Sequence, residues 1–214
     1  MFRNRREAGR ALGEEVKRSV PGPNVLVLAL PRGGVPVGYE VARALHAPLD
    51  VFLVRKLGMP GEEELAVGAI ASGGVRVLND DLIRYLHVPE RAIEEITQRE
   101  QQELERRERF YREERAPLPV EGRTVVLVDD GLATGASMLA AARALHPQRA
   151  RRVVVAVPVA ARQTCDEFRG EVDQVVCLKT PHPFGAVGVW YEDFSQISDE
   201  EVKTLLKESA SVPI

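Results

Sequence analysis

Two adjacent carboxylates, Asp129 and Asp130, follow an apolar run at 124–128 and precede a glycine-bracketed turn. The run is β-branched and has no polar break, which is typical of a parallel strand covered on both faces. Open α/β sheets bind ligands at the carboxyl ends of such strands. We therefore expect both carboxylates to face a ligand at this edge of a sheet.

The turn that follows the carboxylates has the composition of an anion site. Gly131 and Gly135 permit positive φ and a close approach of the backbone, so the amides between them can converge on one anion. A helix expected at 136–145 directs the positive end of its dipole at the same point. The residues expected to bind a phosphate monoester are Gly131, Leu132, Ala133, Thr134, Gly135 and Ser137.

Ionised carboxylates only accept hydrogen bonds and would repel a phosphate, so Asp129 and Asp130 suit a neighbouring diol. A ribose 5-phosphate meets both demands, with its phosphate in the turn and its 2- and 3-hydroxyls on the carboxylates. Substitution at the anomeric carbon develops positive charge, which the same acids would stabilise. Two simpler interpretations are a solvated acid pair in an ordinary strand-turn-helix and an acid pair that ligates a metal for phosphatase-like chemistry.

These residues resemble the fingerprint of the type I phosphoribosyltransferases: a hydrophobic strand, two acids, small residues and Thr-Gly. The resemblance implies transfer of ribosyl 5-phosphate from phosphoribosyl pyrophosphate (PRPP) to a nucleobase or similar nitrogen acceptor, with release of pyrophosphate. It implies Mg²⁺, bound mainly through PRPP and in addition through Asp129 and Asp130. The candidate catalytic residues are Asp129, Asp130 and Lys56.

A second strand-turn-helix resembles the pyrophosphate loop of the same family. A strand expected at 24–30 runs into Pro31-Arg32-Gly33-Gly34, where small residues let the backbone approach a diphosphate and Arg32 offers a guanidinium fork. The resemblance implies a cis non-proline peptide at Arg32 or its neighbours. A Gly-Gly turn with a surface arginine is the alternative. The candidate pyrophosphate-binding residues are Arg32, Gly33, Arg55 and Lys56.

The segment 55–64, which leaves a strand expected at 49–55, is expected to form a mobile lid. Gly58 and a later Pro-Gly pair interrupt regular structure, and three glutamates favour water. In the family, a loop at this place closes over the reaction and excludes water. Strand alternation sends Arg55 and Lys56 to opposite faces, and Lys56 is the preferred contact for pyrophosphate.

The segment 179–195 is dense in proline, glycine and aromatic residues and resembles the C-terminal hood that covers the acceptor in this family. Aromatic side chains there can stack on a heterocycle, and the alternative is that they belong to the core. The candidate base-binding residues are Phe184, Trp190 and, from a neighbouring strand edge, Val159.

Strands and helices alternate along the chain, with strands expected at 24–30, 49–55, 66–72, 75–78, 123–129, 152–158 and 172–178. Such alternation specifies an α/β fold with a doubly wound, mostly parallel sheet, here one phosphoribosyltransferase-like domain over 1–214. A helical insert at about 80–115 is expected to pack as an exposed helix on the domain edge, or else to form a dimerisation arm. No residue of the insert is expected to take part in chemistry.

The composition is consistent with a soluble enzyme of 214 residues, 44% hydrophobic and 29% charged, with a net charge of -3. No basic tract favours a nucleic-acid partner. No apolar run approaches the roughly 18 residues of a membrane span, and the charged amino terminus does not resemble a signal peptide, so a cytoplasmic location without membrane contact is expected. Cys165 and Cys177 are expected to be reduced and structural.

The main alternative to an enzyme is a non-catalytic regulatory protein that binds PRPP. The lid and Lys56 favour the enzyme, because a sensor does not need to exclude water. A phosphosugar hydrolase would require a positioned water and an acid that the sequence does not single out. Members of the family are commonly dimers, so the resemblance allows a homodimer beside the small-molecule substrates.

Overall fold

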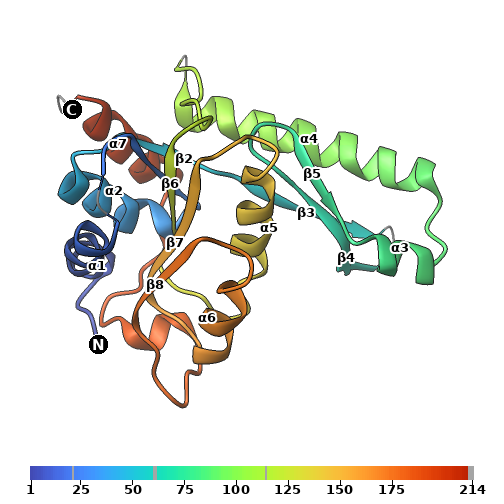
Figure 1. Ribbon diagram of the computed structural model, residues 1–214. Helices are drawn as coiled ribbons and strands as arrows, with labels where there is room; N and C mark the ends of the chain where they lie inside the picture. The colour runs from blue at the N-terminus through green and yellow to red at the C-terminus, as the bar shows by residue number, and fades with distance from the viewer. Residues whose placement is uncertain (21, 60–61, 114, 212–214) are drawn as a thin grey trace.

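The computed structural model describes residues 1–20, 22–59, 62–113 and 115–211, which form an α/β body and a projecting arm (Figure 1). The body contains a five-stranded sheet, and the arm contains a separate three-stranded sheet beneath a long helix. The candidate site lies where the two sheets meet, so both parts of the molecule supply its residues.

The sheet of the body has the strand order β2-β1-β6-β7-β8, and every neighbouring pair is parallel. Its strands are β1 (Val25–Ala29), β2 (Leu49–Val51), β6 (Thr124–Val128), β7 (Arg152–Val159) and β8 (Gln174–Lys179). The inner strands are almost entirely apolar and buried, because helices cover both faces. The expected doubly wound parallel fold is confirmed.

Two hydrophobic cores lie on opposite faces of this sheet. In β6, Val126 and Val128 pack into one core while Val125 and Leu127 pack into the other, as strand alternation requires. The first core contains side chains of α1 (Arg5–Ser19), α2 (Gly34–Leu45) and α7 (Asp199–Ala210), and the second contains those of α5 (Ala136–Leu145) and α6 (Arg162–Phe168).

The arm is an antiparallel sheet of β3 (Val54–Met59), β4 (Glu62–Ala71) and β5 (Val75–Leu78), followed by α3 (Asp80–Tyr85) and the long α4 (Glu90–Arg112). The helix α4 runs along β3 and β4 (Figure 1). Ile93, Ile96 and Leu104 of its apolar stripe are buried. The insert is therefore helical as expected, and α4 covers one face of the arm sheet.

A buried ion pair fastens the end of α4 to the body. Arg112 Nε donates to Asp50 Oδ1 over 2.9 Å, and Arg112 Nη2 donates to the Val51 carbonyl over 2.9 Å. The amide of Leu118 donates to the second carboxylate oxygen of Asp50 over 3.1 Å. Because these groups satisfy one another, the carboxyl end of α4 has a defined position beside β2.

The expectation of a single strand at 49–55 is wrong, whereas the expected lid is not tested. The strand expected at 49–55 is two strands in different sheets, since the chain leaves the body at Phe52 and Leu53 and enters the arm as β3. The segment expected to be a lid begins as the antiparallel strands β3 and β4, with a shift of register at Gly58, and its mobility stays a prediction. Pro60 and Gly61 lie outside the described residues.

The expectation of two reduced cysteines is also wrong, because Cys165 and Cys177 form a disulfide between α6 and β8. Their separation of twelve residues suggests no bond, but α6 packs back against β8 and brings the two sulfurs together. No helix within the described part of the chain has the length and apolarity needed to cross a bilayer.

Candidate functional site

Two loops meet at the carboxyl edge of the parallel sheet because β1 and β6 are adjacent and in register, with Ala29 opposite Val128. The loop after β1 packs directly against the acid pair after β6. A Cβ added to Gly33 would lie 2.0 Å from Asp130 Oδ2, and one added to Gly34 would lie 2.8 Å from the Val128 carbonyl. Only glycine permits this contact, and the peptide Pro31-Arg32 is cis, as the resemblance implied.

Asp130 is held from behind by the first helix and by the expected hood. Arg5 Nε donates to Asp130 Oδ2 over 2.7 Å, and Tyr191 donates its hydroxyl to the Asp130 carbonyl over 2.6 Å. The Arg5 guanidinium also lies 3.9 Å from the ring centre of Phe194 and donates to the Ser195 carbonyl. Sequence reasoning missed Arg5 and Tyr191, since no local pattern links them to residues far away along the chain.

Asp129 lies at the floor of the site, where its Oδ1 accepts a hydrogen bond from the Asp130 amide over 2.8 Å. Burial and the neighbouring Asp130 charge raise the pKa of Asp129 well above its usual value. Burial also raises the pKa of Asp130, although the hydrogen bond and charge of Arg5 oppose this rise. The pair thus has one cation for two acids and suits hydroxyl donors or a second cation.

The turn after the acids has the geometry of an anion site, with one exception. Gly135 has a φ of 71°, and the Thr164 hydroxyl fixes the turn by donating to the Ala133 carbonyl over 2.6 Å. Ala133, Thr134 and Ser137 are exposed, and among the described residues the amides of 133–137 donate to no acceptor.

The exception is Leu132, whose expected role in binding phosphate does not fit the structure. Its amide donates to the Val159 carbonyl over 3.0 Å, and its side chain is buried in the core. Leu132 extends the pairing of the sheet by an isolated bridge to Ala160. Its contribution is therefore to fix where the turn begins.

A polar cavity of about 210 Å³ lies beside the acid pair and is open to both the body and the arm. It is lined by Arg32 from the loop after β1, Asp129, Ser137 and Arg55. Arg55 donates to Glu100 of α4 over 2.6 Å. The structure thus brings Arg32 and Arg55 together beside the carboxylates, with room for a small anion.

Arg55, and not Lys56, lines this cavity, and the expected contact of Lys56 with pyrophosphate stays a prediction. Lys56 lies on the opposite face of β3, as strand alternation requires, and lines a separate cavity of about 700 Å³ between the arm sheet and α5. Ser137 lines both cavities. A residue at 56 can therefore approach the phosphate turn only from the far side of β3.

The insert, of which no residue was expected to take part in chemistry, supplies side chains to the lining of the polar cavity. Arg107 and Tyr111 of α4 line the polar cavity with Arg32 and Arg55. Tyr111 donates its hydroxyl to Asp199 over 2.6 Å, and Asp199 lies 3.9 Å from Arg32. In the sequence, Tyr111 counted as one more apolar position of the helix, and Arg107 was one charge among many.

The expected base-binding residues are not gathered at this cavity. Val159 has no exposed surface and its carbonyl accepts from Leu132, so its expected contact with a base is wrong. Trp190 Nε1 donates to the Phe184 carbonyl over 2.9 Å, and both rings pack on a small cluster around Phe2 and Tyr191. For Phe184 and Trp190, contact with a base stays a prediction.

Within the described parts of the chain, no three histidine, cysteine, aspartate or glutamate side chains lie close enough to hold a metal ion. Asp129 and Asp130 are the two carboxylates at this edge, so a metal here would also need oxygen atoms of a bound ligand.

Comparisons with known proteins agree with this geometry. The model of the phosphoribosyl transferase domain family matches residues 54–193. Two Mycobacterium tuberculosis proteins, from strains H37Rv and CDC 1551 and each named "Putative phosphoribosyl transferase", are 47% identical over 206 residues. That alignment covers 96% of this chain and 46% of theirs, so the chain spans about half the length of these curated relatives.

A solved structure with much the same fold is the protein TT1426 from Thermus thermophilus. It is 45% identical to this chain and superposes with a TM-score of 0.87, over 97% of this chain and 98% of the other. The likeness thus includes the arm as well as the body.

Proposed function

Because the chain belongs to the phosphoribosyl transferase domain family, we propose that it transfers ribosyl 5-phosphate from PRPP to a nitrogen acceptor and releases pyrophosphate. The observation that carries this proposal is the contact of the two loops at the sheet edge, where Gly33 touches Asp130. This contact sets a loop suited to a diphosphate beside one suited to a sugar phosphate, as a substrate with both groups requires.

In this proposal, the 5-phosphate accepts hydrogen bonds from the amides of 133–137 and from the hydroxyls of Thr134 and Ser137. The positive end of the α5 dipole supports the same phosphate. The ribose hydroxyls donate to Asp129 and Asp130. As the bond from the anomeric carbon to pyrophosphate lengthens, these carboxylates stabilise the positive charge that develops on the sugar.

The leaving pyrophosphate occupies the polar cavity, where Arg32 and Arg55 donate hydrogen bonds to its oxygens. The backbone amide of Gly33, in the loop after β1, is a further donor to the same group. Lys56 acts on this reaction only from the other face of β3. The acceptor is a nucleobase or a related nitrogen compound, and Phe184 and Trp190 remain the candidates to contact it.

Magnesium fits the donor set at the acid pair. Burial raises the pKa of Asp129, so a divalent cation bound there with PRPP would supply the positive charge that this carboxylate lacks. When bound, Mg²⁺ supplies charge that stabilises the pyrophosphate leaving group. Asp129 and Asp130 would hold it by their oxygens, together with oxygens of PRPP.

The test is a pyrophosphate-release assay with PRPP, Mg²⁺ and a panel of purine and pyrimidine bases, alongside calorimetric titration with PRPP. We expect release with at least one base, and weaker PRPP binding after Thr134→Val but not after Thr204→Val, an exposed threonine on α7. Tight PRPP binding without release would favour the non-catalytic regulator. Absence of PRPP binding would overturn both functions.

A salvage role for nucleotides, a cytoplasmic location and a homodimer complete the proposal. The salvage role and the homodimer rest on the family resemblance, and the cytoplasmic location rests on the composition of the sequence. Light scattering of the purified protein would measure the oligomeric state directly.

A further inference from the structure

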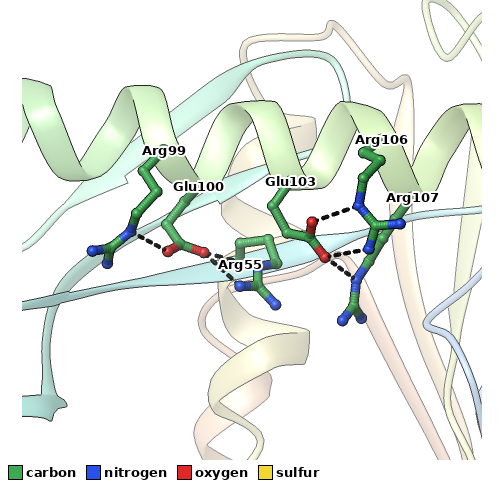
Figure 2. Close-up of polar contacts among 6 residues, drawn as sticks. All are labelled: Arg55, Arg99, Glu100, Glu103, Arg106 and Arg107. Atoms are coloured by element: carbon green, nitrogen blue, oxygen red, sulfur yellow. Dashed lines mark hydrogen bonds and ion pairs between the residues drawn. The ribbon is translucent and has the colours of Figure 1, made fainter.

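Side chains of the long helix α4 and of β3 form a row of paired charges (Figure 2), of which Arg55 and Arg107 line the polar cavity. Glu100 accepts hydrogen bonds from Arg55 and Arg99, and Glu103 accepts from Arg106 and Arg107. Each carboxylate is thus shared by two guanidinium groups. Four cations and two anions leave this row with a positive excess, on the side where Arg32 adds another cation.

Several donors in this row make no hydrogen bond to another described residue. Arg107 donates to Glu103 through Nε alone, over 2.8 Å, so its two terminal nitrogens have no acceptor among the described residues. Arg55 donates to Glu100 through Nε and Nη2, which leaves Nη1 without one. Arg32 approaches Asp199 at 3.9 Å, which is too long for a hydrogen bond.

The helical repeat of α4 places Arg107 on the face that borders the polar cavity. Glu103, Arg107 and Tyr111 follow at intervals of four and therefore lie on one face of α4. Arg107 and Tyr111 line the same cavity as Arg32 and Arg55, which come from the body loop and from β3. The cavity thus has a guanidinium on each of three separate elements.

We propose that Arg107 of the insert helix binds the pyrophosphate group, so that α4 forms a fixed third wall of the diphosphate site. The proposal rests on the proposed function and adds a residue from an element that the sequence did not connect with chemistry. A planar guanidinium fork with free terminal nitrogens matches two oxygens of a diphosphate. Glu103 orients Arg107 without occupying that fork.

The wall is positioned before any ligand binds. The buried pair of Arg112 and Asp50 fastens α4 little more than one turn beyond Arg107, and the buried Tyr111 bonds to Asp199 of α7. Burial, with Asp199, raises the pKa of Tyr111 to about 12, so its hydroxyl stays a neutral donor at physiological pH. The helix is fixed by these contacts and the Arg107 side chain is oriented by Glu103, so Arg107 loses little conformational freedom when it binds an anion.

The experiment is calorimetric titration of the whole chain with inorganic pyrophosphate, with and without Mg²⁺. We expect Arg107→Gln to weaken pyrophosphate binding about tenfold or more, as loss of a charge-assisted bond implies. Arg107→Lys should restore part of the affinity, because it keeps the charge but not the fork. The Arg107 side chain is exposed enough that folding should be unaffected, which thermal melting would check.

The matched control is Arg106→Gln. Arg106 bonds to the same Glu103, so its substitution removes the same charge from the helix, but Arg106 does not line the cavity. Unchanged affinity in Arg106→Gln with a loss in Arg107→Gln supports the proposal. Unchanged pyrophosphate affinity in Arg107→Gln would overturn the proposal. Equal losses of affinity in both variants would also overturn it, because they would show only the effect of the overall charge of the helix.

The pyrophosphate titration and the PRPP assay can fail independently of each other. If pyrophosphate binding depends on Arg107 but PRPP is neither bound nor turned over, the diphosphate site stands and the transferase does not. If PRPP is turned over while Arg107→Gln binds pyrophosphate as the native chain does, the transferase stands and the role of Arg107 is overturned.

Discussion

The two sides of the site are built in different ways. At the sheet edge, the parts are held by backbone: two parallel strands in register, glycines in van der Waals contact with carboxylates, and amides at the start of α5. On the arm, the parts are side chains, and pairs such as Arg55 with Glu100 join residues far apart in the sequence. Backbone geometry is encoded in short motifs, whereas such pairs depend on how whole elements pack.

The electrostatics of the two sides also differ. Burial raises the pKa of both acids at the sheet edge, and the charge of Asp130 raises the pKa of Asp129 further. The arm charges are mostly exposed and lie in alternating order, and Arg106 and Arg107 lower the pKa of Glu103 to about 2. We infer that the acids at the sheet edge lower the stability of the fold in favour of ligand binding, whereas the charges along α4 hardly lower it.

The largest expected effect tests how the arm is fastened to the body. Arg112→Ala should lower the free energy of unfolding by about 3 to 5 kcal/mol, because it leaves Asp50 buried without its cation. Chemical denaturation would measure the change. Arg109→Ala, nearly one turn earlier and exposed, should change it by less than about 0.5 kcal/mol. Similar small values for both would show that α4 is not anchored by this pair.

The next effect tests the contact between the loops of the sheet edge. Gly33→Ala should lower the rate of pyrophosphate release from PRPP by about 100-fold, because the new Cβ would displace Asp130. Steady-state kinetics would measure the loss. Gly170→Ala is the control, since a Cβ there meets nothing within 4 Å. Full activity in Gly33→Ala would mean that this close packing is not needed for catalysis.

The smallest effect tests the electrostatic cost at the sheet edge. The folded-state pKa of Asp129 is raised, so the native chain loses stability as pH rises from about 4 through that pKa. Asp129→Asn does not titrate and keeps an oxygen for the Asp130 amide. It should therefore be more stable than the native chain by about 1 kcal/mol at pH 7, with the difference vanishing near pH 4.

The measurement for Asp129→Asn is urea denaturation at a series of pH values. Asp166→Asn, at an exposed position on α6, should give a curve parallel to that of the native chain. A destabilised Asp129→Asn at pH 7 would show that the carboxylate is a structural partner and not a strained ligand group.

The sheet edge was largely predictable from the sequence because each of its requirements is local. An uninterrupted β-branched run predicted β6, and glycines beside Asp129 and Asp130 predicted a turn with close backbone contacts, as Gly135 confirms. The same reasoning failed at Leu132, because whether an amide is free depends on the strand that lies beside it.

The arm was less predictable. Residues 49–55 form one plausible strand in isolation, and only the packing of two sheets shows that the chain changes sheets at Phe52 and Leu53. Alternation correctly placed Arg55 and Lys56 on opposite faces, but it did not show which face borders the cavity beside the acid pair. The disulfide between Cys165 and Cys177 was missed for the same reason, since it depends on α6 folding back on β8.

The sequence by itself determined the strand β6, the glycine turns and the acid pair, because steric limits and hydrophobic alternation act between residues close in the chain. Only the tertiary structure decided that Arg5 holds Asp130 and that Arg107 and Tyr111 reach the cavity of Arg32. Arg5 and Asp130 are 125 positions apart, and contacts of this kind form only when independent elements pack. No short-range pattern in the chain specifies that packing.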